Sequence, residues 1–149
     1  MLTGITDVDA SYVLRNLREK SREECELQGR TPITLSAMLA HQRIAWTIWY
    51  ENKPAALIGA MPLHRGVWSL FGFGTDAWVK VWRLVTLTAR RDMMRAVTDT
   101  GAHRAQCLSP ATHTDTHKWL RLLGASYEVD LPAYGVNGED FKMFAWLKG

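Results

Sequence analysis

The sequence predicts an α/β (α+β) protein with a mixed, mostly antiparallel, twisted sheet of about six to seven strands, flanked by about four helices. Two observations support this prediction. Short apolar, aromatic-rich runs alternate with helical patterns along the chain, and a hairpin signal is followed by strand-helix-strand stretches that imply crossover connections. With 149 residues, 47% of them hydrophobic, the chain can bury one good core. We therefore expect a single domain over residues 1–149.

The elements are expected at these positions, in chain order: helices over 7–28 and 36–42, strands over 44–50, 55–61 and 67–73, a helix over 84–98, a strand over 102–108, a helix over 112–123, and strands over 126–131 and 141–147. A short initial strand over 2–6 stays open, because so few residues define it.

The first helix is predicted from its caps and its apolar stripe. Asp7 or Asp9 caps its start, and Gly29 ends it. Pro32 then breaks the chain before the helix over 36–42. The charged second half of the first helix is expected to form i,i+4 ion pairs, such as Lys20 with Glu24 and Arg22 with Glu26.

The first three strands form a hairpin and its extension. The runs over 44–50 and 55–61 flank the polar stretch 51–54, which predicts an antiparallel pair with a four-residue turn. A turn around Gly66 then precedes the strand over 67–73.

The second half of the chain alternates helices and strands. The helix over 84–98 ends at Gly101, and residues 78–82 before it also suit a short extended segment. After the strand over 102–108, the dipeptide Ser109-Pro110 is expected to act as a break.

The last helix is predicted from the ends of its sequence pattern. Thr112 and Asp115 have the spacing of a capping box, Trp119 lies on the apolar face, and Gly124 stops the helix. The strands over 126–131 and 141–147 close the sheet.

Composition limits the function classes. The formal net charge of +3 is too small to demand a nucleic acid or an anionic membrane as partner. Cys25 and Cys107 are isolated, which favours reduced thiols and no disulfide. Neither a signal peptide nor an apolar run of about 18 residues is present, so no membrane span is expected.

Seven tryptophans are unusual in a chain of this length. Large aromatic residues most often pack a core. They are also enriched where proteins dock on partners. The sequence leaves both interpretations open.

The stretch 117–129 (HKWLRLLGASYEV) resembles the helix-glycine-strand unit near the end of GNAT acyl-CoA N-acyltransferases. From Val67 to the C-terminus the chain is more specifically similar to small GNAT-like proteins of tailed bacteriophages, including the internal virion protein A family of short-tailed phages. The resemblance implies a GNAT-like fold, other virion or assembly proteins as partners, and a location in the host cytoplasm during infection and in the virion interior.

The resemblance also implies a site for acetyl-CoA or another acyl-CoA. GNAT enzymes bind the pyrophosphate with a Q/R-x-x-G-x-G/A loop at a helix N-terminus, where the helix dipole favours anions. Here Ser69 replaces Gln or Arg, and Asp76 opposes a phosphate. The stretch 69–74 is thus either a phosphate cradle or a plain strand-ending turn. If CoA binds, the expected contacts are Leu70, Phe71, Gly72, Phe73 and Gly74.

The catalytic residues are harder to assign. The family often has a Tyr proton donor four residues before the helix-ending glycine, where this chain has Leu120. Tyr127 and Tyr134 are the substitute candidates, although each also suits an ordinary aromatic residue at a sheet edge. Glu23 is the candidate base. Further ionisable candidates, each equally consistent with a solvated surface, are Glu24, His41 and His64.

Two other constellations carry weaker signals. His113 and His117 stand at i,i+4, a spacing that can present two imidazoles to one metal, but no third ligand is evident and no metal site is expected. A basic series on the longest helix suits either an anion, the CoA 3′-phosphate or a nucleic acid, or an ordinary solvated face; it comprises Lys80, Arg83, Arg90, Arg91 and Arg95.

Two functions remain on sequence grounds. The residues at positions 69, 76 and 120 favour a catalytically degenerate GNAT-like protein, an internal virion or morphogenesis component that acts through protein contacts. The alternative is an active acyl-CoA-dependent N-acetyltransferase that modifies an amine on a protein or a small molecule.

Overall fold

The structure, a computed structural model, describes residues 2–148. Its elements are, in chain order, β1 Leu2–Thr3, α1 Asp7–Arg15, α2 Glu19–Leu27, α3 Pro32–Leu39, β2 Ile44–Tyr50, β3 Lys53–His64, β4 Val67–Gly74, α4 Trp78–Thr88, a π-helical segment Ala89–Met93, α5 Met94–Asp99, β5 Arg104–Pro110, α6 Thr114–Leu122, β6 Ser126–Leu131 and β7 Phe141–Leu147.

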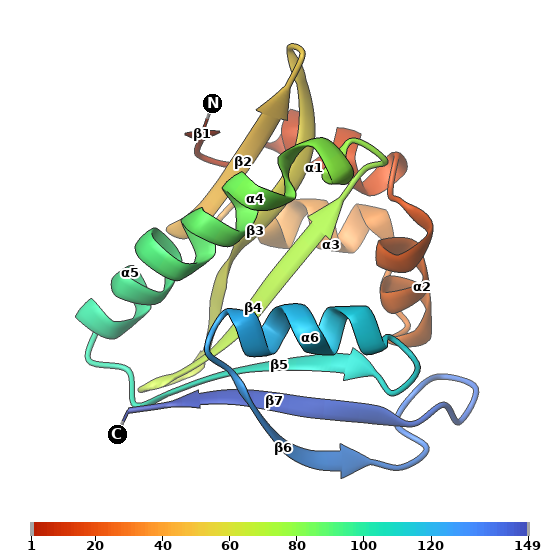
Figure 1. Cartoon of the computed structure of the whole chain (residues 1–149). Coiled ribbons are helices and arrows are strands. Elements are labelled where there is room, and N and C mark those ends of the chain that lie inside the picture. Colours follow the sequence, from red (N-terminus) through yellow and green to blue (C-terminus); the bar gives the residue numbers. More distant parts are fainter. Residues whose placement is uncertain (1, 149) are drawn as a thin grey trace.

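The strands form one seven-stranded sheet in the order β1-β2-β3-β4-β5-β7-β6 (Figure 1). Every neighbouring pair is antiparallel except β4 and β5, which run parallel. The predicted mixed, mostly antiparallel sheet is confirmed.

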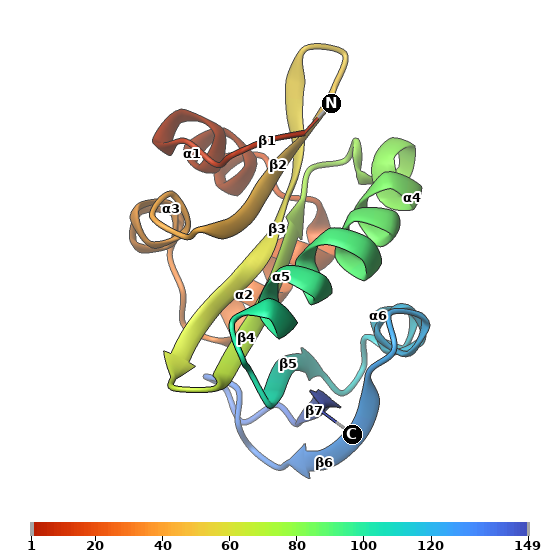
Figure 2. The ribbon, with the colours of Figure 1, turned by 90° about the vertical axis from the view of Figure 1, so that its left-hand side faces the viewer.

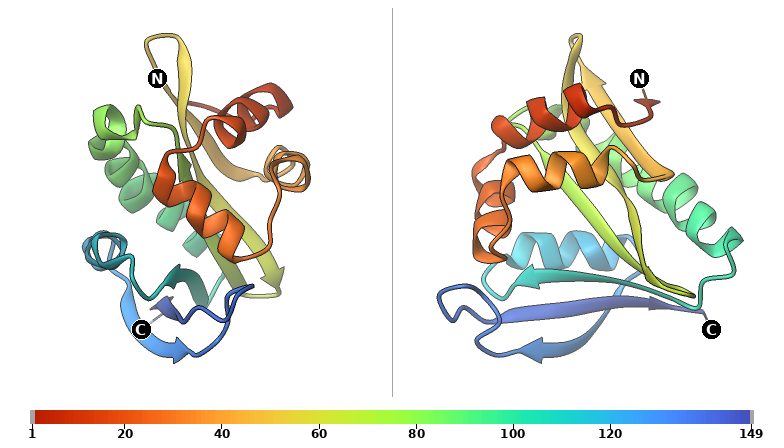
Figure 3. Two further views of the ribbon diagram at one scale, coloured as in Figure 1. Left: turned by 90° about the vertical axis from the view of Figure 1, so that its right-hand side faces the viewer. Right: turned by 180° about the vertical axis from the view of Figure 1, so that it is seen from behind.

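Helices cover both faces of this sheet (Figure 2). The views from two further sides place α1 and α3 on one face and the α4–α5 rod with α6 on the other, while α2 descends toward β5 (Figure 3). The largest cluster of buried apolar residues joins the sheet to α4 and α5, and a second joins it to α1 and α3. Helices that could cross a bilayer are not found in the described part of the chain.

The predicted first helix is two helices, because the chain breaks at Leu17. The backbone of Leu17 forms a bridge with Thr75, and the Arg18 N–H donates to the carbonyl of Gly74 at 2.8 Å. These tertiary bonds replace helical ones, and α2 starts afresh at Glu19. The sheet and its helical cover therefore contain five helical rods where four were expected.

The caps of the first and third helices also differ from the prediction. Thr6, rather than Asp7 or Asp9, is the N-cap of α1, and its hydroxyl forms a reciprocal capping box with Asp9. Pro32 does not break the chain before a helix; it is the first residue of α3, where a missing N–H costs nothing.

The hairpin of β2 and β3 is confirmed, with a tighter turn than predicted. Glu51 and Asn52 have φ angles of 48° and 64°, so two residues with positive φ make the turn. The strands β2, β6 and β7 have the predicted bounds.

The long helix begins earlier than predicted, at Trp78. The alternative of an extended segment over 78–82 is wrong, because Val81 and Val85 lie one helical turn apart and are both buried on the sheet. A π-helical segment inserts an extra residue before α5.

The break expected at Ser109-Pro110 is absent, since β5 pairs with β7 through Pro110. The predicted capping box of α6 is also wrong. His113 is the N-cap and gives no side-chain capping bond, while Asp115 instead pairs with Lys20 of α2 at 3.2 Å.

Candidate functional site

The parallel strands β4 and β5 separate partway along their length. Only three residue pairs join them, from Val67 with Arg104 to Ser69 with Gln106. Beyond that point β4 continues to Gly74 and β5 to Pro110 without pairing to each other. The gap leaves one backbone edge of each strand open in the middle of the sheet.

A cavity of about 90 Å³ lies at this separation. Strands β4 and β5 form two of its walls, α2 a third and α6 a fourth. Its lining residues are Glu24, Cys25, Gln28, Arg30, Met61, Ser69, Leu70, Phe71, Gly72, Phe73, Cys107, Leu108, Thr116, Trp119 and Leu120.

Four of the five predicted cofactor contacts, the residues from Leu70 to Phe73, line this cavity. The fifth, Gly74, has other partners: its N–H donates to the Ser21 hydroxyl at 3.2 Å, and its carbonyl accepts from the Arg18 N–H. Because alternate residues of a strand direct their backbone polar groups to the same side, Gly72 and Leu70 present theirs to the gap as Gly74 does. Whether any of these residues binds CoA stays a prediction.

Two further hollows continue from the cavity along the helices. One, of about 190 Å³, shares Thr116 and Trp119 with the cavity and is also lined by Arg18, Lys20 and Asp115. It lies beside the start of α4, whose first turn has neither an acidic residue nor a side-chain cap. The next hollow follows the outer face of α4 and includes the basic residues Arg83, Arg90 and Arg91.

Trp119 lines both the cavity and the neighbouring hollow, and Trp78 lines that hollow beside it; this pair is called the tryptophan neck. The rings of Trp78 on α4 and Trp119 on α6 meet edge to face, with centroids 5.6 Å apart. The Trp119 indole N–H also donates to the Thr86 hydroxyl at 2.8 Å. These contacts join α4 to α6 where the cavity and the hollow meet.

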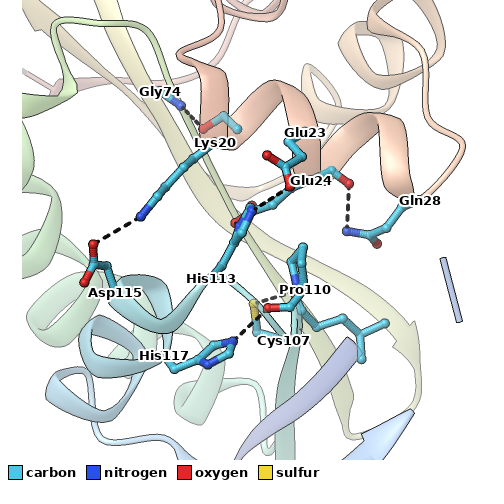
Figure 4. A network of polar contacts seen from close by, with 12 residues as sticks. Lys20, Glu23, Glu24, Gln28, Gly74, Cys107, Pro110, His113, Asp115 and His117 are labelled. Atoms are coloured by element: carbon cyan, nitrogen blue, oxygen red, sulfur yellow. Dashed lines mark hydrogen bonds and ion pairs between the residues drawn. The ribbon is translucent and has the colours of Figure 1, made fainter. Parts of the chain in front are cut away.

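A histidine between two carboxylates stands at the α2 wall (Figure 4). The His113 side chain is 5% exposed; its Nδ1 lies 3.1 Å from Glu24 Oε1 and its Nε2 lies 3.3 Å from Glu23 Oε1. The hydrogen bond to Glu24 raises the pKa of His113 above its usual value against the opposing effect of burial, and Glu23 raises it further.

The cluster contains the predicted catalytic candidate Glu23. It also contains the pairing of Glu24 with His113, which the sequence did not predict. Glu23 was expected at the site without any marked partner, and the i,i+4 pairing of Glu24 with Lys20 is wrong, because Lys20 binds Asp115 instead. No spacing signal links α2 to His113, since 89 residues separate Glu24 from His113.

His117 has a separate environment from His113. Its Nε2 lies 3.0 Å from the carbonyl oxygen of Pro110, and its ring packs on Phe144. Burial lowers the pKa of His117, so its neutral form is favoured. Between residues 2 and 148 no group of three or more His, Cys, Asp or Glu side chains is arranged to hold a metal ion.

The two tyrosine candidates lie outside the cavity lining. Tyr127 on β6 donates its hydroxyl to Asp130 at 2.8 Å, and its ring packs on Phe144. Tyr134 is half exposed and packs against Phe141. The structure therefore brings neither hydroxyl to the gap between β4 and β5. His41 and His64 also lie outside the cavity and are exposed.

Two cysteines and Leu120 in the cavity wall do not exchange protons near pH 7. Burial raises the pKa of the Cys25 thiol to about 11 and that of Cys107 to about 12, so both are neutral near pH 7. Leu120, at the position of the family's proton donor, is 2% exposed and packs with Ala125 and Phe144. Glu24 and the His113 cluster are thus the groups at this wall that can exchange protons.

Comparison with solved structures finds close matches in shape. The yncA structure from Salmonella typhimurium, which holds its cofactor acetyl-CoA, matches with a TM-score of 0.77 at 10% identity over 99% of this chain and 92% of its own. A ribosomal-protein-alanine N-acetyltransferase from Brucella melitensis matches with a TM-score of 0.76 at 10% identity over 99% of each chain. A GNAT-family acetyltransferase from Streptococcus pneumoniae matches with a TM-score of 0.73 at 17% identity over 100% of this chain and 99% of its own.

Sequence comparisons give no such match: no protein-family model and no curated protein matches this chain. The structural likeness extends over the whole sheet and its helices, at identities that define architecture and not activity. The protein therefore has the GNAT acetyltransferase fold.

Proposed function

We propose that this protein is an acyl-CoA-dependent N-acyltransferase, with the acyl thioester held in the gap between β4 and β5. The observation that carries the proposal is the cavity at this gap, which combines an open backbone edge with a carboxylate. Residues Leu70 to Phe73 supply backbone groups for the amide-rich arm of acyl-CoA, and Glu24 supplies the carboxylate. Acyl-CoA brings an activated acyl group, so the protein has to position it and manage the protons of the acceptor amine.

The hollows outside the neck suit the rest of such a ligand. A long thioester with its sulfur in the cavity extends past Thr116 and Trp119 into the hollow that holds Arg18 and Lys20. The positive end of the α4 dipole lies beside this hollow and favours a phosphate. Lys20 already pairs with Asp115, which leaves Arg18 as the principal cation for the diphosphate.

The cavity is small for a ligand as long as acyl-CoA. Ligand pockets usually measure about 300–1,000 Å³, whereas the cavity here measures about 90 Å³. Binding of the arm therefore requires the Trp78 and Trp119 side chains to separate, which joins the cavity to the neighbouring hollow. Both side chains are partly buried against the core, so their separation uncovers apolar surface that the bound arm has to cover again.

Thermal unfolding with CoA tests the proposal. A ligand at about 100 times its Kd stabilises a fold by about 2.7 kcal/mol, which raises the Tm of a chain of this size by several degrees. Arg18→Gln should weaken the effect, while the matched control Arg15→Gln, on the exposed end of α1, should keep it. The absence of any shift at millimolar CoA would overturn the proposal.

A second function is favoured by a different observation. Leu120 removes the family's proton donor and the tryptophan neck narrows the path, as expected of a degenerate GNAT-like protein that works through protein contacts. The phage role stays a prediction from the sequence resemblance. It would make the chain an internal virion or morphogenesis component, with other virion proteins as partners, in the host cytoplasm and the virion interior. Its test is the presence of the chain in purified particles or assembly intermediates, and absence from both contradicts it.

A further inference from the structure

The His113 cluster runs from the wall of the cavity to the outside of the protein. Glu24 lines the cavity and has a side chain that is 20% exposed, His113 behind it is 5% exposed, and the outer carboxylate of Glu23 is 46% exposed. The contacts of 3.1 Å and 3.3 Å involve the two different ring nitrogens of His113. An imidazole bonded in this way can accept a proton on one nitrogen and release one from the other.

We propose that Glu24, His113 and Glu23 form a proton relay that carries the proton of the acceptor amine from the cavity to solvent. The proposal rests on the proposed acyl transfer and deepens it. Glu24 is the group that faces the amine, His113 passes the proton on, and Glu23 is the exit. His113 is a positioning residue in this scheme, because it acts through Glu24.

The proton balance of the reaction shows which proton such a path carries. An amine enters as an ammonium ion near pH 7. Its nitrogen forms the new bond to the acyl carbon while the carbon–sulfur bond breaks, and the amide that results carries two protons fewer on nitrogen than the ammonium ion. One of these protons ends on the sulfur of the leaving thiol. The other leaves the protein, so each turnover releases one proton to solvent.

Within the protein this released proton moves by matched exchanges. Glu24 takes it from the ammonium nitrogen and passes it to Nδ1 of neutral His113, while Nε2 gives its own proton to Glu23. Glu23, half exposed, releases that proton to water. No group is oxidised or reduced; His113 ends neutral with its proton on Nδ1, and a ring flip restores the starting tautomer.

The charged surroundings of His113 suit this role. Glu23 and Glu24 face it from α2, and both raise its pKa, while burial lowers the pKa of His117 on α6. Cys107 of β5 lies beside the cluster (Figure 4) and stays a neutral thiol. The raised pKa makes His113 a better proton acceptor than a free histidine, and its two ring nitrogens face the two different carboxylates.

The first measurement is independent of turnover. NMR titration of the His113 ring should give a pKa above that of a free histidine, and Glu24→Gln should lower it more than Glu23→Gln does, because the Glu24 hydrogen bond is the larger cause. The matched control Lys20→Gln removes the other ion pair between α2 and α6 and should leave the value unchanged. A His113 pKa that ignores both glutamates would overturn the relay.

The second measurement is the pH profile of thiol release from acetyl-CoA, with ethylamine as the acceptor probe, over about pH 5 to 8. The wild-type rate should rise with pH as His113 loses its proton. His113→Asn and Glu24→Gln should lower kcat by about 10²- to 10³-fold, with KM for acetyl-CoA little changed. His113→Asn should also remove the rise of the rate with pH. Glu23→Gln should move the rise of the rate to lower pH, and the control Arg15→Gln, on the exposed end of α1, should keep both the rate and its pH dependence.

The outcomes separate the relay from the proposed function. If CoA binds and ethylamine is acylated, but His113→Asn lowers only the Tm and keeps the rate and its pH dependence, then the cluster only stabilises the fold and the relay is wrong. If CoA binds and no thiol is released above the solvent background, the relay is also wrong. If CoA fails to bind, the acyltransferase proposal fails first and the relay falls with it.

Discussion

Gly74 at the end of β4 allows a direct test of why the chain has a Gly-x-Gly sequence there. A Cβ atom at this position would lie 2.5 Å from Cε3 and 3.1 Å from Cβ of Trp78. The Trp78 ring lies edge to face against Trp119, so turning it away breaks this contact. Overpacking of this kind costs about 1–3 kcal/mol, offset by about 0.4–1 kcal/mol from the stiffer unfolded chain. We expect Gly74→Ala to destabilise the fold by about 1–2 kcal/mol.

Gly72→Ala is the matched control for this prediction. A Cβ atom there meets its nearest neighbour, Cγ2 of Ile58, at an ordinary 3.8 Å, so stability should stay the same or rise slightly. Urea unfolding followed by tryptophan fluorescence measures both variants, and the cost of Gly74→Ala should vanish in a Trp78→Ala background. Equal effects of the two glycine substitutions, or an equal cost in both backgrounds, would refute the packing argument.

Four further predictions concern buried or partly buried polar groups. The pKa of His113 is raised, so its contribution to stability is full below the pKa of an unfolded histidine, about 6.5. That contribution is lost as pH rises through the folded pKa. In urea unfolding, His113→Gln should therefore lose most stability at acid pH. The pKa of His117 is lowered instead, so its contribution to stability is full above about 6.5 and is lost as pH falls through the folded pKa. His117→Gln should therefore reduce the loss of stability that the protein shows at acid pH. Ser109→Ala should leave the Tm unchanged or higher, because the Ser109 hydroxyl is buried without a partner, and a clear loss would contradict this. Trp119→Phe should cost about 1 kcal/mol through loss of the hydrogen bond to Thr86, and an unchanged Tm would show that this bond contributes nothing.

Local signals predicted much of the sheet. The apolar run from Ile44 to Tyr50 and the last two strands have the predicted bounds, because alternation and turn residues lie within the segments themselves. Gly101 and Gly124 follow the ends of their helices with φ angles of 86° and 98°, a conformation that glycine adopts without strain. At such positions the nearby residues decide the structure.

Elements that depend on distant partners were predicted less well. The helix break at Leu17 arises from a bridge to Thr75, and nothing in the sequence around Leu17 signals it. The capping box at the start of α6 fails because Asp115 turns toward Lys20, 95 residues earlier in the chain. In both places a tertiary contact outweighs a local preference of about 1 kcal/mol.

The candidate site divides in the same way. The place of Leu70 to Phe73 among the expected cofactor contacts followed from the GNAT resemblance; these residues line the cavity, and their binding of CoA stays a prediction. The pairing of Glu24 with His113 was not predicted, because ion pairing across α2 and α6 depends on the two helices meeting at the separated strands. Sequence spacing alone cannot place two side chains that belong to different elements of the fold.

The missing proton donor at Leu120 and the cluster at His113 bear on different steps of an acyl transfer. A thiol with a pKa of about 8.5 leaves as a thiolate at a cost of about 2 kcal/mol near pH 7, since each pKa unit corresponds to about 1.4 kcal/mol. An ammonium ion with a pKa of about 10.4 must lose a proton at a cost of about 4.6 kcal/mol before it can attack. Deprotonation of the amine is therefore the larger requirement, and Glu24 with His113 stands where it can be met. Leu120 removes help from the easier step, so its presence does not by itself exclude catalysis by this fold.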